Sequence, residues 1–91
     1  MALTFTGTTT WDTDRFVLKI ETFDGDKRVA CAVSSEALMD RGRSKDGSIA
    51  SLLALYDAFK AEIQAIAQRK YAAGTKEADG LVLVRTADLN R

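Results

Sequence analysis

Histidine and proline are absent from this chain of 91 residues, and cysteine occurs once. Without histidine the chain lacks the side chain that most often serves as a general base near neutral pH and as a metal ligand. Ser-His-Asp triads and Cys-His nucleophile pairs are therefore excluded. The lone Cys31 cannot form an internal disulfide, which is typical of a protein from a reducing compartment.

Charge of one sign and long apolar runs are missing as well. Lys and Arg number 13, as do Asp and Glu, so the net charge is zero and gives no general attraction to nucleic acid or acidic membranes. The longest apolar run, residues 52–56, is far shorter than the ~20 residues of a membrane span. The first ten residues lack the basic and apolar regions of a signal peptide. We expect one soluble, cytoplasmic domain over residues 1–91.

A β-hairpin is the clearest local prediction. Residues 15–22 and 27–33 alternate between apolar and polar side chains, as half-buried strands do. Asp24-Gly25 between them is the favoured pair for a type I′ turn. That turn sets a register, which pairs Ile20 with Val29, Leu18 with Cys31, Phe16 with Val33, and Glu21 with Arg28. The predicted core face carries Phe16, Leu18, Ile20, Val29, Cys31 and Val33.

Two helices are expected next. Ser34-Ser35-Glu36 joins a hydroxyl cap to an acid in the first turn, and the short helix should end near Gly42. A polar loop, 41–47, leads to a long helix capped by Ser48 and ended by Gly74. Its apolar stripe is Ile49, Leu52, Tyr56, Phe59, Ile63 and Ile66, widened by Leu53 and Ala67. About 25 residues span about 38 Å, so one end should overhang the shorter strands.

The remaining apolar segments complete the predicted sheet. Residues 81–86 are apolar on both faces through Val84 and predict a third strand, which we expect to pair antiparallel with either hairpin strand. Residues 2–6 predict an edge strand, with Leu3 and Phe5 on one face. The fold class is α+β: a two-layer sandwich in which a small, mostly antiparallel sheet, made from the N-terminal hairpin and the C-terminal strand, is covered on one face by a short and a long helix.

Carboxylates and the thiol predict no catalytic or metal site. Asp12 and Asp14 begin like a calcium loop, but Phe16 and Val17 occupy positions that such a loop needs for oxygen ligands and glycine. Cys31 alternates with core residues and should behave as a small buried hydrophobe. We expect no catalytic residue, cofactor or metal.

Five residues are candidates for contact with a partner: Trp11, Arg41, Arg43, Lys45 and Lys70. The three basic residues of the 41–47 loop suit a phosphate, although Asp40 and Asp46 flank them and no phosphate-binding motif is present. Trp11 stands in a polar stretch, where it either folds back over the edge of the sheet or anchors a partner.

The outer face of the predicted hairpin raises the question of assembly. It carries Val17, Ala30 and Ala32, together with alternate residues of the C-terminal strand. Helices of this chain cover only one side of the sheet. Either the N-terminal segment, with Leu3, Phe5 and Trp11, folds across the other side, or a second copy covers it in a homodimer.

Several short motifs together resemble a known family. They are Trp11-Asp12, the run from Cys31 to Leu38, Ile63, Ala67, Arg69-Lys70, Gly74, Asp79-Gly80 and Asp88-Leu89. This pattern is similar to that of a family of small bacterial proteins catalogued only as a domain of unknown function. The resemblance implies a compact α+β domain of the bacterial cytoplasm and implies no activity.

Three functions remain open from the sequence. We favour a small non-enzymatic protein-interaction or regulatory module, because the chain has neither a histidine base nor a phosphate loop and is too short to enclose a deep pocket easily. A nucleic-acid-associated protein would use Arg41, Arg43 and Lys45, helped by Arg69 and Lys70. A small enzyme or ligand-binding protein would use carboxylates and Lys70.

Overall fold

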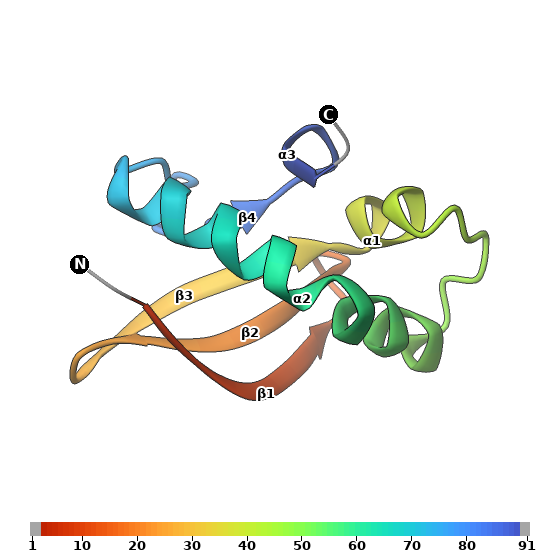
Figure 1. Cartoon of the computed structure of the whole chain (residues 1–91), viewed down its shortest axis with the longest axis horizontal. Helices are drawn as coiled ribbons and strands as arrows, with labels where there is room; N and C mark the ends of the chain where they lie inside the picture. Colours follow the sequence, from red (N-terminus) through yellow and green to blue (C-terminus); the bar gives the residue numbers. More distant parts are fainter. Residues whose placement is uncertain (1–2, 90–91) are drawn as a thin grey trace.

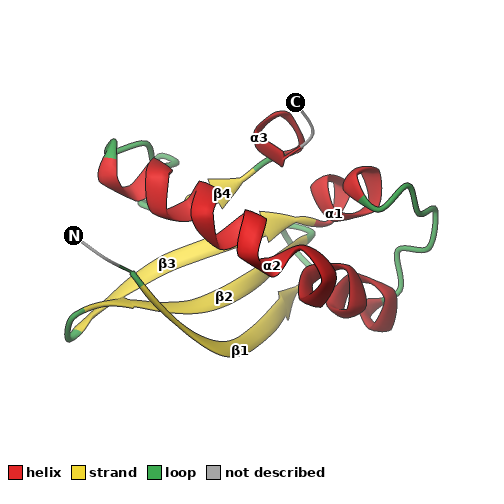
Figure 2. Cartoon of the chain, in the orientation of Figure 1, coloured by secondary structure: helices red, strands yellow, loops and turns green. Residues whose placement is uncertain are grey.

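A computed structural model describes residues 3–89. The strands are β1 (Thr4–Asp12), β2 (Val17–Asp24), β3 (Lys27–Ser34) and β4 (Val82–Val84), in the spatial order β1-β2-β3-β4. The helices are α1 (Ser35–Arg41), α2 (Ile49–Ala72) and α3 (Thr86–Leu89). Figures 1 and 2 show α2 lying across one face of the sheet, with α1 and α3 beside it. The two-layer α+β arrangement predicted from the sequence is confirmed.

The hairpin forms where predicted, but the predicted register is wrong by two residues. Ile20 lies opposite Cys31 and Leu18 opposite Val33, because the turn is built on Gly25-Asp26. Gly25 has a φ of 61°, and Asp26 has no positive φ. This matches the φ pattern of a type II′ turn, which needs glycine only at its first central position. A slip of two residues keeps every side chain on its predicted face. The predicted pair of Glu21 and Arg28 survives diagonally, as an ion pair of 3.4 Å.

Phe16 is the one wrong member of the predicted core face. Its side chain is 63% exposed, and its φ of 53° lies in the left-handed region. β2 begins at Val17, so Phe16 belongs to the turn between β1 and β2. The apolar alternation extends one residue ahead of the first residue of β2. The pattern alone therefore does not show where the strand begins.

The C-terminal strand is shorter than predicted and runs the other way. β4 spans only Val82–Val84 and pairs parallel with β3, where Val82 lies opposite Cys31 and Val84 opposite Val33. Two helices separate β3 from β4, and a helical crossover returns the chain in the same direction. Thr86 begins α3, which the sequence reading did not include.

β1 is longer than the strand predicted over residues 2–6. It reaches Asp12, so Trp11 is part of the sheet; Ala2 lies outside the described residues. Phe5 pairs with Thr22 and Thr9 with Ile20, so β1 has three residues where β2 has only Glu21. Gly7, within this bulge, has a φ of 90°. Such an insertion bends an edge strand locally.

Both helix starts follow the predicted capping. The Ser34 hydroxyl accepts a hydrogen bond from the backbone N–H of Ala37 at 3.1 Å, and the Ser48 hydroxyl accepts one from Ser51 at 3.3 Å. These bonds satisfy N–H groups that a first helical turn leaves without partners. At the far end of α2, Gly74 adopts a φ of 73°, as its predicted role in stopping the helix requires.

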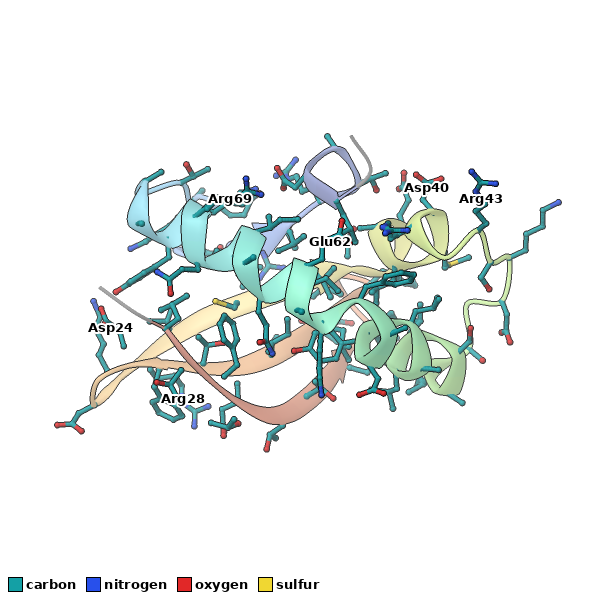
Figure 3. The ribbon with its side chains drawn as sticks, viewed as in Figure 1. Asp24, Arg28, Asp40, Arg43, Glu62 and Arg69 are labelled. Carbon is teal, nitrogen blue, oxygen red and sulfur yellow. The ribbon has the colours of Figure 1, made fainter. Side chains whose placement is uncertain are left out.

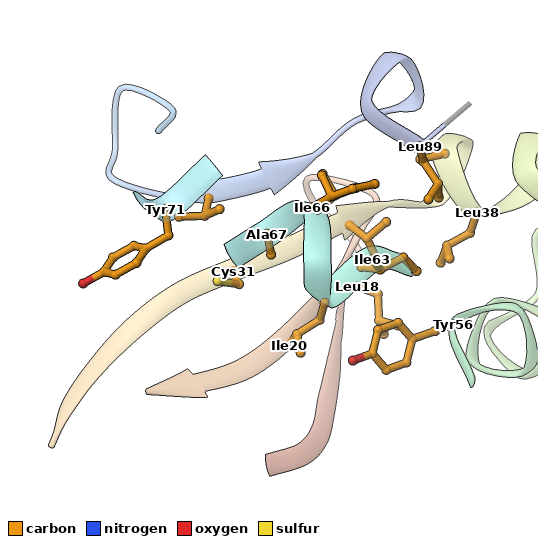
Figure 4. Close-up of a cluster of buried hydrophobic side chains, with 14 of the residues drawn as sticks. Leu18, Ile20, Cys31, Leu38, Tyr56, Ile63, Ile66, Ala67, Tyr71 and Leu89 are labelled. Atoms are coloured by element: carbon orange, nitrogen blue, oxygen red, sulfur yellow. The ribbon is translucent and has the colours of Figure 1, made fainter. Parts of the chain in front are cut away.

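The main core lies between the helices and the inner face of the sheet. Figure 4 shows Leu18 and Ile20 of β2 facing Ile63 and Tyr56 of α2. Buried residues from every layer form one cluster: Leu18, Ile20, Val29, Cys31, Val33, Ala37, Leu38, Leu52, Tyr56, Ile63, Ile66, Ala67, Tyr71, Val82, Val84 and Leu89. In the predicted stripe of α2, Phe59 is partly buried, and Ile49 and Leu53 at its beginning are 50% and 40% exposed; the other members are buried.

A second, smaller cluster lies on the outer face of the sheet. Val17, Ala32 and Leu81 are buried there, and Leu83 packs against them. Arg15, before β2, forms an ion pair of 2.6 Å with Asp79, which precedes Leu81. This ion pair joins two loop segments beside the cluster. Of the outer-face residues expected to need a cover, the chain itself therefore buries Val17, Ala32 and Leu81, whereas Ala30 is exposed.

Candidate functional site

Arg41 of the basic loop is held against the long helix. Its guanidinium lies 3.3 Å from a carboxylate oxygen of Glu62 and 4.4 Å from the centre of the Phe59 ring. The contacts combine an ion pair with a cation–π interaction, and both tie the end of α1 to α2. Arg41 is thereby engaged within its own chain.

Arg43 and Lys45 project from the same loop without converging on Lys70. Both are exposed, and they line a shallow surface pocket that also holds the carboxylates of Glu36 and Asp40. Figure 3 shows Arg43 near the right end of the molecule and Arg69, the neighbour of Lys70, to the left of its middle. The structure thus divides the predicted basic residues between two distant sites, of which the loop site has acidic walls.

Lys70 connects the end of α2 to the C-terminal segment. Its ammonium donates to the backbone carbonyl of Leu83 at 2.8 Å and to a carboxylate oxygen of Asp88 at 2.6 Å. The same Asp88 oxygen accepts the backbone N–H of Arg85 at 2.9 Å. These bonds fix α3 beside β4, so Lys70 has a structural role that the sequence did not explain.

Trp11 lies near the end of β1 on the inner face of the sheet, opposite Leu18. It is partly buried against the main core, and its ring meets that of Phe16 edge to face, with centroids 6.5 Å apart. Edge-to-face packing is a favoured aromatic geometry. The pair joins a half-buried ring to an exposed one at the same corner of the fold.

The turn that carries Phe16 is held by specific hydrogen bonds. One carboxylate oxygen of Asp12 accepts the backbone N–H groups of Asp14 and Arg15, at 3.0 and 3.3 Å. The carbonyl of Phe16 accepts the N–H of Ser35 at 2.9 Å. A bulky residue in the left-handed region is strained, and such strain persists only where its surroundings fix it. These hydrogen bonds fix the turn in a conformation that leaves the Phe16 ring exposed to solvent.

The beginning of α2 presents a second apolar stripe beside its core stripe. Ile49, Leu53, Asp57 and Lys60 follow one another at spacings of four, four and three, so they share one side of the helix. Leu53 also lines a groove of about 440 Å³ between β1 and α2, together with Phe5, Thr6, Gly7, Thr9, Tyr56, Asp57, Lys60 and Gln64. The groove has a partly apolar floor and a rim of both charges.

β1, which forms one wall of this groove, is an edge strand among residues 3–89. Thr4–Trp11 contains no charged residue. Natural edge strands are commonly guarded by charge, proline, a bulge or a covering segment. Here the bulge at Gly7 interrupts the first half, and Thr9–Asp12 is regularly paired with β2. Within this second half, Thr9–Trp11 therefore keeps an uncharged edge beside the exposed start of α2, and Asp12 ends the strand.

The outer face of the sheet carries charges that neutralise one another. A groove of about 440 Å³ there contains Arg15, Lys19, Glu21, Arg28 and Asp79. Each base has an acidic partner: Asp79 for Arg15, Asp12 for Lys19 and Glu21 for Arg28. The backbone N–H of Leu81, and next the Arg15 guanidinium, hold the pKa of Asp79 below its ordinary value. These pairs reduce the attraction of this face for a phosphate.

The thiol of Cys31 and the acidic side chains within residues 3–89 are the other candidates for reactive or metal-binding groups. Cys31 is buried, and burial raises its thiol pKa, so the reactive thiolate is disfavoured. Within residues 3–89 no group of three or more Cys, Asp or Glu side chains is placed to hold a metal ion. None of the helices in this range is long and apolar enough to cross a membrane.

The sequence reading missed the residues that now mark the most exposed apolar surface. Phe16 and Leu53 were assigned to the core, and Ile49 to the buried stripe of the long helix. For Ile49 and Leu53 the sequence held a signal. The helix is longer than the strands it covers, so part of its apolar stripe must extend past the sheet at one end. For Phe16 no local signal existed, because strand alternation looks the same inside and just outside a strand.

Comparison with known proteins identifies the family. A crystal structure of a DUF1488 family protein of unknown function from Shewanella loihica PV-4 superposes with a TM-score of 0.86, at 18% identity and with 91% of each chain covered. The likeness establishes a shared fold. Among curated proteins no match is found. The model of DUF1488, a protein family of unknown function, matches residues 3–84, so the resemblance noted in the sequence is confirmed and the chain belongs to the DUF1488 family.

Proposed function

We infer that the protein is a small, non-enzymatic protein-interaction module of the bacterial cytoplasm. The observation that carries this proposal is a set of three exposed large apolar side chains, one in the turn after β1 and two at the start of α2. Phe16, Ile49 and Leu53 are exposed in a chain whose other large apolar side chains are at least partly buried within the described range. Exposed aromatic and aliphatic anchors next to a polar rim are typical of protein interfaces.

The strain at Phe16 supports the same proposal. Glycine, or a residue with a short polar side chain, would adopt this left-handed φ with less strain. A polar side chain would also avoid exposing an apolar ring to solvent. The turn around Phe16 is held by the Asp12 carboxylate, which accepts from the N–H groups of Asp14 and Arg15, and by the Ser35 N–H, which donates to the Phe16 carbonyl. Strain at a defined surface position points to a role in binding.

The nucleic-acid alternative has less support. Of its proposed residues, Arg41 is bound to Glu62 and Phe59, and Lys70 to Asp88. In the basic loop only Arg43 and Lys45 remain as candidates, and the carboxylates of Glu36 and Asp40 line the same pocket. A site that neutralises several phosphates needs several unpaired cations on one surface.

The cytoplasmic location is part of the proposal. The buried, unpaired thiol of Cys31 suits a reducing compartment. Fractionation of cells that express the tagged chain at native levels tests this point, and recovery in a membrane or periplasmic fraction contradicts it.

Site-specific crosslinking tests the interaction itself. A photo-reactive amino acid replaces Leu53 in cells, and the control carries it at Ala65, an exposed position farther along α2. We expect an adduct with one defined protein at position 53 and none at position 65. Mass spectrometry identifies the partner, which is then purified and titrated with wild-type protein and with Leu53→Glu.

The outcomes separate an interface from a merely exposed surface. Binding that is saturable and at least ten-fold weaker for Leu53→Glu, which is about 1.4 kcal/mol, supports the proposal. Identical adducts at both positions, or no adduct at position 53, contradict it.

A further inference from the structure

We propose that the second half of β1, Thr9–Asp12, pairs with the same segment of a second copy, giving a closed two-fold dimer with a continuous sheet. The partner at this surface is then the chain itself. The inference rests on the proposed function, because it names the occupant of the interaction surface formed by β1 and the start of α2.

The first support is the chemistry of the edge. A two-fold axis brings each strand against its own copy, so a charge on the edge would meet a like charge. Thr4–Trp11 carries none. The single charge that follows, Asp12, is directed into its own chain, where it accepts from Asp14 and Arg15 and lies 3.5 Å from Lys19. The edge can therefore face itself without repulsion.

The bulge defines where such pairing stops. Thr9–Asp12 is regular, whereas the extra residues around Gly7 break the ladder toward Phe5. Pairing between two copies is thus limited to a short antiparallel segment. A short segment with one fixed register closes a dimer and does not continue into a fibre, which is the hazard of a long uninterrupted edge.

The start of α2 in each copy supplies apolar contact area, because four strand residues alone bury too little. A dimer of ordinary stability buries about 800 Å² on each partner, roughly one-seventh of the 5404 Å² of accessible surface here. Leu53 and Thr9 line the same groove, and Figure 1 shows the first turns of α2 close to the end of β1. A strand added to β1 would lie under this part of α2 and would cover Leu53 and the groove beneath it.

Charge on the same helix stripe favours self-association as well. Asp57 and Lys60 stand on the rim of the groove and form an exposed pair of 3.5 Å within one chain. In a two-fold contact the same surface of each copy meets the other. Asp57 of one copy can therefore pair with Lys60 of the second copy across the axis. The net charge of zero adds no long-range repulsion between copies.

Light scattering after size exclusion tests the dimer over a wide range of concentration. We expect the mass to rise from 9.9 kDa to twice that value. Thr10→Glu should abolish the rise, because a carboxylate in the regular half would then face its own copy. Thr10 lies opposite Lys19 in its own sheet, so this variant should fold at least as well as the wild type. Thr4→Glu, on the other side of the bulge, is the matched control and should remain dimeric.

A second pair of variants tests the helix contribution. Leu53→Glu should be monomeric, and Ala65→Glu, an exposed control on the same helix, should behave like the wild type. The single Trp11 reports the change locally, because its fluorescence emission should shift to shorter wavelength as the dimer forms. Circular dichroism confirms that each variant is folded.

Each result decides one of the two proposals. A wild type that stays at 9.9 kDa, a folded Thr10→Glu that still dimerises, or growth into larger assemblies overturns the β1 dimer. If the chain is monomeric but position 53 crosslinks to another protein, the interaction module stands and only its occupant is wrong. If position 53 yields no adduct with either partner, the proposed function fails as well.

Discussion

The hydroxyl of Tyr71, in the last turn of α2, donates a hydrogen bond of 2.6 Å to a carboxylate oxygen of Asp24 at the end of β2. The bond joins residues 47 positions apart and fastens the tip of the hairpin to the helix that covers it. Lys76 lies over the same tyrosine ring, 5.4 Å from its centre. The two contacts connect the hairpin with the segment that leads from α2 to β4.

This bond predicts a measurable titration. The hydrogen bond to Asp24, and next burial, raise the pKa of Tyr71 above its ordinary value of about 10. A raised pKa means that the bond stabilises the fold below pH ~10 and that this contribution is lost as pH rises through the raised value. Asp24→Ala should lower the Tyr71 pKa. Tyrosine NMR signals in a Tyr56→Phe background follow this residue alone, and an unchanged pKa would contradict the assignment.

Gly25→Ala should destabilise the protein by about 1–2 kcal/mol, because the added carbon disfavours the positive φ. No heavy atom lies within 4 Å of the new carbon, so the loss comes from the backbone alone. Gly47→Ala is the control, since Gly47 has no positive φ and its nearest neighbour would be Met39 at 3.6 Å. Urea unfolding compares them; equal stabilities would mean that the turn is not as described.

Lys70→Met should cost about 1–3 kcal/mol, because the Leu83 carbonyl and the Asp88 carboxylate lose a partly buried charged donor. Amide hydrogen exchange should accelerate most in α3, which these bonds hold in place. Arg69→Met, one residue earlier on an exposed position, should leave α3 protected. Equal exchange in both variants would remove the structural role assigned to Lys70.

Cys31 should resist thiol reagents in the native protein and react only as fast as the chain unfolds. Its side chain is 2% exposed, and burial raises its thiol pKa. Cys31→Ser should destabilise the fold by about 1–3 kcal/mol, because it buries a more polar hydroxyl among apolar neighbours. Rapid stoichiometric labelling under native conditions would refute the prediction.

Generic DNA or RNA should not bind measurably near physiological salt. Arg41 and Lys70 are engaged within the chain, and Arg43 and Lys45 stand beside carboxylates. Fluorescence anisotropy with labelled duplexes at several salt concentrations tests this. Micromolar affinity that falls steeply with salt, and is lost when Arg41, Arg43 and Lys45 are replaced together, would reverse the ranking of the two functions.

The candidate surface was only partly visible in the sequence. Trp11 was singled out as a partner contact, and the overhang of the long helix follows from its length. Phe16 and Leu53 were assigned to the core, because apolar periodicity reports which face a side chain occupies and carries no information on where the neighbouring layer ends. The proposed surface lies where the layers cease to overlap.

By itself the sequence determined the hairpin, the two longer helices and the faces of most of their core residues. Ser34 and Ser48 begin the helices, Gly74 follows the end of the long one, and alternation assigns Leu18, Ile20, Cys31 and Val33 to the core. These are local effects of capping, backbone preference and periodicity. Only the tertiary structure decided that Gly25-Asp26 forms the turn, that β4 runs parallel to β3, that Lys70 binds Asp88, and that β1 is the edge next to an exposed Leu53. Each of these depends on which distant segment packs against which, and a pattern that repeats every two or every 3.6 residues cannot distinguish between partners of equal polarity.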